Sequence, residues 1–299
     1  MEKNLKLEKA RALIEGTSEL PTIPVVATKV LELLDKPDVE LDEVADLILT
    51  DQIMAARVIK IVNSPLYRAA QEIRSVKRAL IYLGFRHIRE LALTCSFLEV
   101  FQGKNGVFNI RTFWEHSFGV GVVSKLIAQR ARFPDVEKAY LGGIIHDIGE
   151  VFFSYYLRDQ FQEVLDALKG EAYKLVDAEE KYFGTTHCEI GEIIARNWNF
   201  PADYCEVVSL HHDPKLAVVN PTLTAIVNLA DLFCSVRQLD YEGKEWVSFN
   251  LAEEGAWTIL KNFAPHMRNL DVERFCYELD DKVSEIQELV KSVFEGMEV

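Results

Sequence analysis

The ten residues 141–150, LGGIIHDIGE, constrain the fold of this chain more than any other stretch. His146 and Asp147 stand side by side between apolar and small residues, so we expect both to be buried. A buried carboxylate without a partner is costly, and it usually pairs with another group or binds a cation. Gly149 is expected to end a helix in the left-handed conformation, leaving the His-Asp pair in the last turn. Taken alone, the His-Asp pair fits a buried histidine with a structural aspartate as well as it fits a cation site.

Other histidines and one aspartate lie in or beside apolar helical patterns in the same part of the chain. They are His116, His187, His211, His212 and Asp231. Imidazole and carboxylate groups at helix ends suit a divalent first-row transition metal and do not suit calcium. The alternative is a buried polar network that binds nothing.

Composition excludes several classes of function. The chain has 299 residues, of which 49% are hydrophobic, enough for one large core or two smaller ones. Its net charge of −14 disfavours binding to nucleic acids or to anionic membranes. The sequence shows no signal peptide and no apolar run of about 20 residues, so a cytoplasmic location is expected.

The cysteines are odd in number, widely spaced and without a CxxC pair. This pattern is typical of reduced thiols that mostly fill the core of a cytosolic protein. They are Cys95, Cys188, Cys205, Cys234 and Cys276.

Short amphipathic segments with short joints predict an all-α protein. Asp42 and Asp51 are expected to cap two successive helices, the second over residues 52–62. Thr186 and Glu189 match a capping box ahead of His187. One stretch of the chain is locally positive, and it is interpreted as a solvated face. The alternative is a contact with an acidic partner or with the chain's own acidic surface. The stretch contains Arg57, Lys60, Arg68, Arg74, Lys77 and Arg78.

A polar, glycine-containing joint at residues 102–106 is the best internal boundary in the sequence. We therefore expect an N-terminal helical half over residues 1–105 and a half with the candidate site over 106–240. Residues 241–299 are expected to form a C-terminal helical extension, with apolar residues of 272–290 at core spacing.

Several separated motifs resemble the HDOD family, the HD-related output domain of bacterial signalling proteins. The resemblance covers about residues 18–215, and its motifs stand in the family's order. They are LPTIP at 20–24, DLILTDQ at 46–52, RVIKIVNSP at 57–65 and ALIYLG at 79–84. The resemblance implies an all-α, HD-domain-like helical bundle with an N-terminal helical subdomain.

The resemblance also implies a metal site. Against the H…HD…D signature of the HD superfamily and the histidines of HD-GYP cyclic-dinucleotide phosphodiesterases, seven positions match. They would bind one or two divalent ions of Fe, Mn, Ni or Zn, and they are His116, His146, Asp147, His187, His211, His212 and Asp231. Candidate catalytic residues are Asp147 and Glu150.

Two departures from the HD-GYP pattern argue against hydrolysis. Glu150 stands where that family carries lysine, and a carboxylate there repels a phosphate. No Gly-Tyr-Pro follows His212. Glu150 is instead expected to orient a ligand histidine or to bind metal itself.

The sequence therefore favours a signal-transduction module that acts through a protein partner or a small ligand, such as a nucleotide. Its pocket would hold metal without efficient turnover. The alternative is an active metal-dependent phosphohydrolase that cleaves a nucleotide or cyclic dinucleotide.

Overall fold

The computed structural model of this protein describes residues 2–17, 24–64, 67, 71–100, 106–107, 109–168, 175–237, 239 and 250–294. Every regular element in these residues is a helix, which confirms the predicted all-α class. No helix among them is both long enough and apolar enough to cross a membrane.

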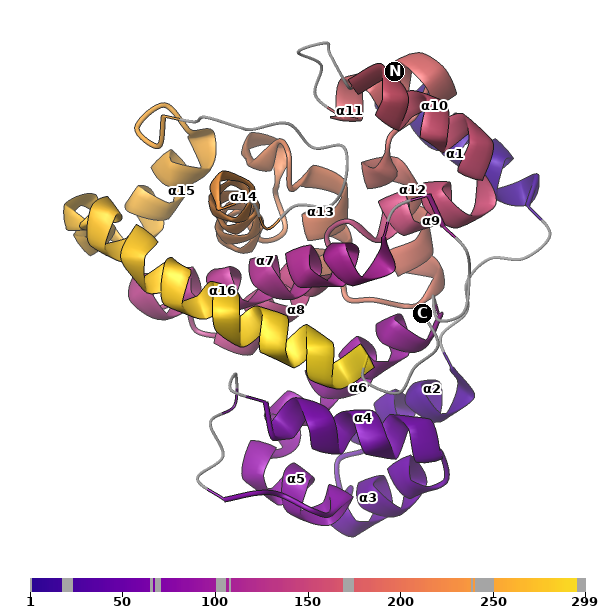
Figure 1. The fold of residues 1–299 in the computed structure, drawn as a ribbon, viewed down its shortest axis with the longest axis vertical. Coiled ribbons are helices and arrows are strands. Elements are labelled where there is room, and N and C mark those ends of the chain that lie inside the picture. The colour runs from indigo at the N-terminus through magenta and orange to yellow at the C-terminus, as the bar shows by residue number, and fades with distance from the viewer. Residues whose placement is uncertain are drawn as a thin grey trace. The chain divides into compact units, whose positions relative to one another are not determined.

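The chain forms two compact units (Figure 1). Unit 1 contains residues 1–20 and 104–280, and unit 2 contains residues 21–103 and 281–299. The three-part division expected at residues 105 and 240 stays a prediction, because compactness alone does not decide which segments fold independently.

The described residues of unit 2 form five short helices and the C-terminal part of a sixth. Asp51 accepts hydrogen bonds from the backbone amides of Ile53 and Met54, so its predicted helix cap is confirmed. The predicted cap at Asp42 is wrong, since the helix begins at Leu41, two residues earlier than that cap implies, and Glu40 holds the N-cap position. The helices are α2 (Val25–Leu34), α3 (Leu41–Leu49), α4 (Gln52–Val62), α5 (Val76–Leu83) and α6 (Phe85–Val100).

Arg57 does not lie on a solvated face, and its assignment to one was wrong. The side chain is 1% exposed on α4 and donates to the backbone carbonyl of Cys95 on α6. A buried guanidinium is tolerated where it finds acceptors. Arg57 therefore links two helices of unit 2 rather than facing a partner.

Unit 1 holds the candidate site, and most of its helices surround that site. They are α1 (Glu2–Glu15), α7 (Ile110–Ala131), α8 (Val136–Ile145), α9 (Ile148–Tyr156), α10 (Arg158–Leu168), α11 (Leu175–Phe183), α12 (His187–Asn197), α13 (Ala202–Leu210), η1 (Pro214–Leu216), α14 (Pro221–Val236), α15 (Gly255–Phe263) and η2 (Pro265–Asn269). Helix α16 (Val272–Phe294) begins in unit 1 and continues into unit 2.

Helices α7 and α8 cross at two glycines. A Cβ atom on Gly143 would lie 2.7 Å from the Cα atom of Gly121, so a side chain at Gly143 would force the two backbones apart. Helix α14 also packs on α7 and α8. The crossing brings the interior of α7 close to the end of α8, where the His-Asp pair lies.

Gly149 is not a helix cap, contrary to the sequence prediction. Helix α8 ends at Ile145, and Gly149 lies in the first turn of the next helix, α9, with Asp147 at its N-cap position. A Cβ atom on Gly149 would lie 1.9 Å from the backbone oxygen of His187. The glycine is therefore required by the close approach of α12, and Gly191 on α12 faces it.

Candidate metal centre

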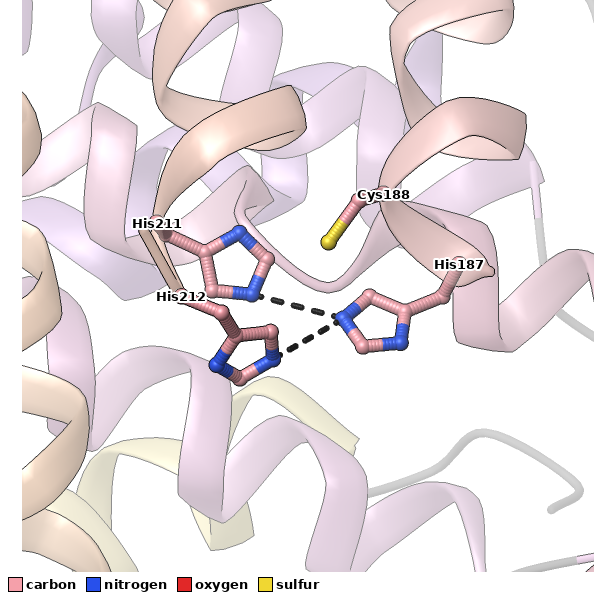
Figure 2. Close-up of side chains that lie close together, drawn as sticks. All are labelled: His187, Cys188, His211 and His212. Carbon is pink, nitrogen blue, oxygen red and sulfur yellow. Dashed lines mark hydrogen bonds between the residues drawn. The ribbon is translucent and has the colours of Figure 1, made fainter. Parts of the chain in front are cut away.

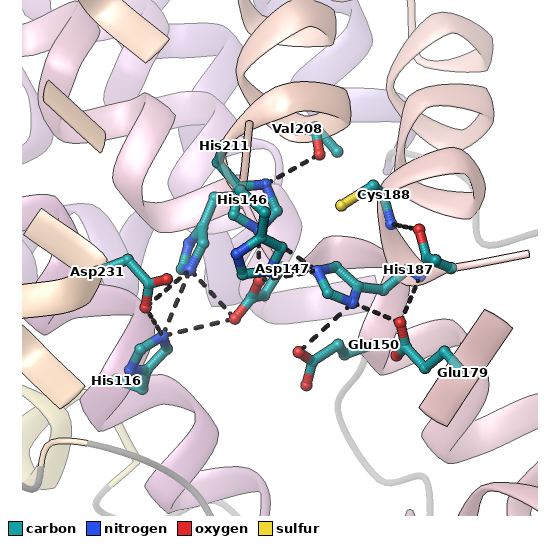
Figure 3. A network of polar contacts seen from close by, with 12 residues as sticks. His116, His146, Asp147, Glu150, Glu179, His187, Cys188, Val208, His211 and Asp231 are labelled. Carbon is teal, nitrogen blue, oxygen red and sulfur yellow. Dashed lines mark hydrogen bonds and ion pairs between the residues drawn. The ribbon is translucent and has the colours of Figure 1, made fainter. Parts of the chain in front are cut away.

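All seven predicted ligand residues meet in unit 1, and Figure 3 labels them except for His212. His116 and Asp231 lie within the long helices α7 and α14, whereas the other five lie at helix ends. The α8–α9 junction supplies His146 and Asp147, and the start of α12 supplies His187. His211 and His212 follow the end of α13. Their role as ligands stays a prediction.

Four of these residues form a first group of donors, called here the first centre. The Nε2 atom of His116 lies 3.3 Å from Nε2 of His146 and 3.4 Å from Oδ1 of Asp231. The Nε2 atom of His146 lies 3.1 Å from Oδ2 of Asp147. Ligand atoms about 2.1 Å from one ion lie roughly 3.0–3.4 Å apart, so these distances suit a shared cation.

Three histidines form a second group on the other side of Asp147, called here the second centre. The Nε2 atom of His187 lies 3.4 Å from Nε2 of His211 and 3.2 Å from Nε2 of His212. Oδ1 of Asp147 lies 3.3 Å from Nε2 of His211 and 3.6 Å from Nε2 of His187. One carboxylate thus presents its two oxygens to two separate sets of histidines.

The hydrogen bonds of the first-centre histidines fix which ring nitrogen carries the proton. Nδ1 of His116 donates to the Leu239 carbonyl at 2.6 Å, and Nδ1 of His146 donates to the Gly143 carbonyl at 2.7 Å. In a neutral imidazole the other nitrogen, Nε2, is then an acceptor. The two Nε2 atoms, at 3.3 Å, therefore face each other with lone pairs. Such a contact needs a shared proton or a bound cation.

The second centre repeats this arrangement. Nδ1 of His187 donates to Oε2 of Glu179 at 2.8 Å, and Nδ1 of His211 donates to the Val208 carbonyl at 3.0 Å. The Nε2 atoms of both rings lie close to each other, and that of His187 also lies close to His212. The donor set therefore fits a divalent transition metal at each centre, with imidazole nitrogens and carboxylate oxygens as ligands.

Burial and charge distinguish two of the second-centre histidines. Burial alone lowers the pKa of His187, but the neighbouring Cys188 and Glu179 outweigh it, and the pKa lies well above its ordinary value. Burial lowers the pKa of His211, which keeps this imidazole neutral and its Nε2 lone pair available.

Two residues near the histidines were not assigned a site role from the sequence. Glu179 on α11 is fully buried, and it binds both the backbone amide and the ring of His187. Its helix has a charged, amphipathic sequence, so no local signal distinguishes it from a solvated acid. Cys188, predicted as core filler, lies among the second-centre histidines.

Glu150, the other candidate catalytic residue, is fully buried on α9. Its Oε1 lies 3.8 Å from Nδ1 of His187, and it belongs to a group of close donors with Asp147 and His187. This placement is compatible with both predicted roles, as a partner of a ligand histidine or as a ligand.

The all-α fold is the HD-domain-like helical bundle that the resemblance implies. The HDOD domain pattern matches residues 20–214, and the chain belongs to this family. A crystal structure of an HDOD domain protein of unknown function from Geobacter sulfurreducens is similar over nearly the whole length. It is 35% identical, covers 98% of this chain and 99% of that one, and superposes with a TM-score of 0.85.

Two more distant crystal structures share the fold. A protein of Shewanella amazonensis SB2B, provisionally named a phosphohydrolase, is 20% identical over 94% of this chain and 98% of that one, with a TM-score of 0.73. A protein of Marinobacter aquaeolei VT8, provisionally named a signal transduction protein, is 18% identical. The match covers 99% of this chain and 67% of that one, with a TM-score of 0.76.

An uncharacterized protein of Treponema pallidum (strain Nichols) is 22% identical over 240 residues. The match covers 78% of this chain and 45% of that protein, so the chain spans less than half the length of this curated relative.

Proposed function

We propose that this protein is a signal-transduction module that holds two divalent transition metal ions and acts through a partner or ligand, without efficient turnover. The first ion would be held by His116, His146, Asp147 and Asp231. The second would be held by His187, His211 and His212, with the other oxygen of Asp147. The division of the Asp147 oxygens between two sets of histidines carries this proposal.

The charge of the pocket supports binding rather than hydrolysis. Bound divalent ions supply phosphohydrolases with activated water and with positive charge for the phosphate. Here the carboxylates of Asp147, Glu150, Glu179 and Asp231 are all buried around the centres. Ionised, they balance two divalent ions, so little net positive charge is left to attract a phosphate.

An ordered surface loop follows the second-centre histidines at the end of α13 in the sequence and suits a regulated contact. Glu206 on α13 accepts hydrogen bonds from the backbone amides of Val218, Val219 and Asn220 at 2.6–2.8 Å. Val218 is nevertheless 85% exposed and Val219 57%. An ordered loop that exposes apolar side chains is suited to a protein partner.

Helix α13 supports both the loop, through Glu206, and the second centre, through the histidines that follow its end. His211 follows α13, and its carbonyl accepts a hydrogen bond from Asn228 on α14 at 2.7 Å. An ion that fixes His211 and His212 therefore also fixes the start of the segment that leads to the loop. We propose that metal loading changes how this loop meets a partner.

Elemental analysis of protein purified without chelator tests the metal proposal. About two equivalents of iron, manganese, nickel or zinc are expected. His146→Ala should lose the first-centre ion, and Asp147→Ala should lose both ions. Wild-type protein that neither contains metal nor takes it up would contradict the proposal.

Hydrogen exchange tests the link to the loop. Metal loading should slow exchange of the backbone amides of residues 211–220 in the wild type and leave them unchanged in His212→Ala. Equal exchange rates with and without metal would contradict the proposed effect of metal on the loop, but they would not contradict the metal-binding proposal.

The second candidate function is a metal-dependent phosphohydrolase. One observation favours it: the two oxygens of Asp147 face two histidine groups, the kind of bridged arrangement that two-metal phosphoryl chemistry uses. Release of nitrophenol from bis(p-nitrophenyl) phosphate by metal-loaded protein, abolished in His146→Ala, would favour this candidate. Metal-loaded protein without turnover would favour the binding module.

A further inference from the structure

We propose that Cys188 is a metal ligand, and that His187, Cys188, His211 and His212 form a site of one thiolate and three imidazoles for a thiophilic ion such as zinc. The inference rests on the proposed function, since it assumes that the second centre binds metal. It adds a ligand and a metal preference that the resemblance to HD proteins does not imply.

The four donors lie close together. One ligand atom from each residue lies within 4.8 Å of the ligand atoms of the other three. Figure 2 shows the Cys188 thiol directed toward the space between the rings of His187 and His211. Cys188 is 7% exposed, while His212 is exposed to solvent, so the group has a buried side and an open side.

The start of α12 explains how neighbouring residues reach one ion. Adjacent helical side chains point about 100° apart, so they converge only on a point beyond a helix end. Helix α12 begins at His187, and its first turn is held by the capping box of Thr186 and Glu189. Glu179 binds Nδ1 of His187 and so directs Nε2 toward His211 and His212.

The thiol adds a donor to the second centre without replacing Asp147. His187 and His211 each belong to one group of mutually close donors with Cys188 and to another with Asp147. Cys188 and the three imidazoles form the kind of four-ligand set that zinc prefers. The facing oxygen of Asp147, 3.3 Å from Nε2 of His211, then links this ion to the first centre.

The chemistry of sulfur predicts which ion binds. Thiolate ligands select zinc over manganese, whereas imidazole and carboxylate ligands discriminate less. Coordination deprotonates the thiol, and its proton passes to solvent. The second centre should therefore prefer zinc over manganese more strongly than the first centre, which has no sulfur among its donors.

A buried cysteine is more often a small apolar filler, and the two roles predict different results. A filler leaves the bound metal unchanged when it is replaced by alanine. A ligand contributes a sulfur-to-metal charge-transfer band with Co²⁺, which substitutes for zinc in tetrahedral sites. Cobalt titration of the apo-protein, followed by near-ultraviolet absorption and by elemental analysis, separates them.

The wild type should bind Co²⁺ with a sulfur-to-cobalt band, and Cys188→Ala and Cys188→Ser should lose the band. Their affinity for zinc should fall by more than about tenfold. Cys205→Ala is the matched control, because Cys205 is also buried, on α13, and contacts only a backbone carbonyl at 3.5 Å in the hydrogen bonds of the described residues.

Cobalt bound by the wild type without a sulfur band overturns the assignment of Cys188 and leaves the metal-binding function standing. A band that persists in Cys188→Ala and Cys188→Ser also overturns it. Failure of the wild type to bind any cobalt contradicts both the proposed function and this inference.

Discussion

The two centres are built from similar residues, but their supports differ. In the first centre, His116 and Asp231 project from the interiors of α7 and α14, and Asp231 is 5% exposed. In the second centre, His187 is the first residue of α12 and His211 follows the last residue of α13, while His212 is exposed. Helix interiors hold side chains more firmly than helix ends, which fray.

If both centres bind metal as proposed, this difference predicts a division of tasks. The first centre would hold its ion more firmly, since its backbone is held on both sides of each interior ligand. The second centre has an exposed histidine, His212, so its ion would exchange more readily with the surroundings. Asp147 links them, because its carboxylate faces both centres.

Replacing the shared carboxylate should have the largest effect. Asp147→Asn is expected to weaken metal binding at both centres by more than about 100-fold, since one ligand serves two ions. Metal content measured by elemental analysis should fall at both centres together. The control is Asp159→Asn, an exposed carboxylate in the first turn of α10. Loss of only one ion would show that the centres do not share Asp147.

Removing one histidine from each centre should separate the two ions. His116→Ala is expected to lose the first-centre ion and keep a zinc ion at the second centre, and His212→Ala should do the reverse. Zinc and manganese contents after competitive loading measure this. His266→Ala, which removes an exposed histidine outside both centres, should change neither content. Equal losses in the two variants would mean that the centres load as one unit.

Replacing the buried partner of His187 should have a smaller, one-sided effect. Glu179→Gln keeps an acceptor for the ring but removes the charge, and second-centre affinity should fall roughly 10- to 100-fold. Calorimetric titration with zinc measures the change. Glu180→Gln is the matched control, because the neighbouring side chain is 43% exposed and contacts Lys6. Unchanged zinc affinity in Glu179→Gln would show that Glu179 does not support metal binding at the second centre.

Crowding the contact between α9 and α12 should cost stability as well as metal. Gly149→Ala places a Cβ atom against the His187 carbonyl, and overpacking of this kind lowers the free energy of unfolding by about 1–3 kcal/mol. Urea denaturation measures the loss. Gly142→Ala is the control, since its Cβ atom would have only ordinary contacts, the shortest 3.4 Å, with Val227. Equal stabilities of the two variants would contradict this account.

The sequence predicted the fold class and several helix ends, because these depend on local patterns. The cap at Asp51 and the capping box at Thr186 and Glu189 are confirmed, since each concerns residues within a few positions of one another. The seven candidate ligands were chosen from residue type, apolar context and family resemblance. The structure brings them together but does not test their ligand role.

Three of the failures share one physical cause, a contact that the local pattern does not reveal. Gly149 resembles a helix cap locally, yet its small size is needed for the His187 backbone. Glu179 resembles a solvated acid, yet it is buried against a histidine eight positions later. Arg57 resembles part of a basic face, yet its acceptor is the Cys95 carbonyl. Local patterns carry no information about such partners.

The position of Asp147 between two sets of histidines has a thermodynamic consequence. If occupation of one centre changes the affinity of the other by some factor, the second changes the first by the same factor. A drop in the available zinc would thus change the metal affinity of the first centre, which holds no sulfur, because both centres contact the Asp147 carboxylate. The protein would then report the ratio of two metals rather than the amount of either.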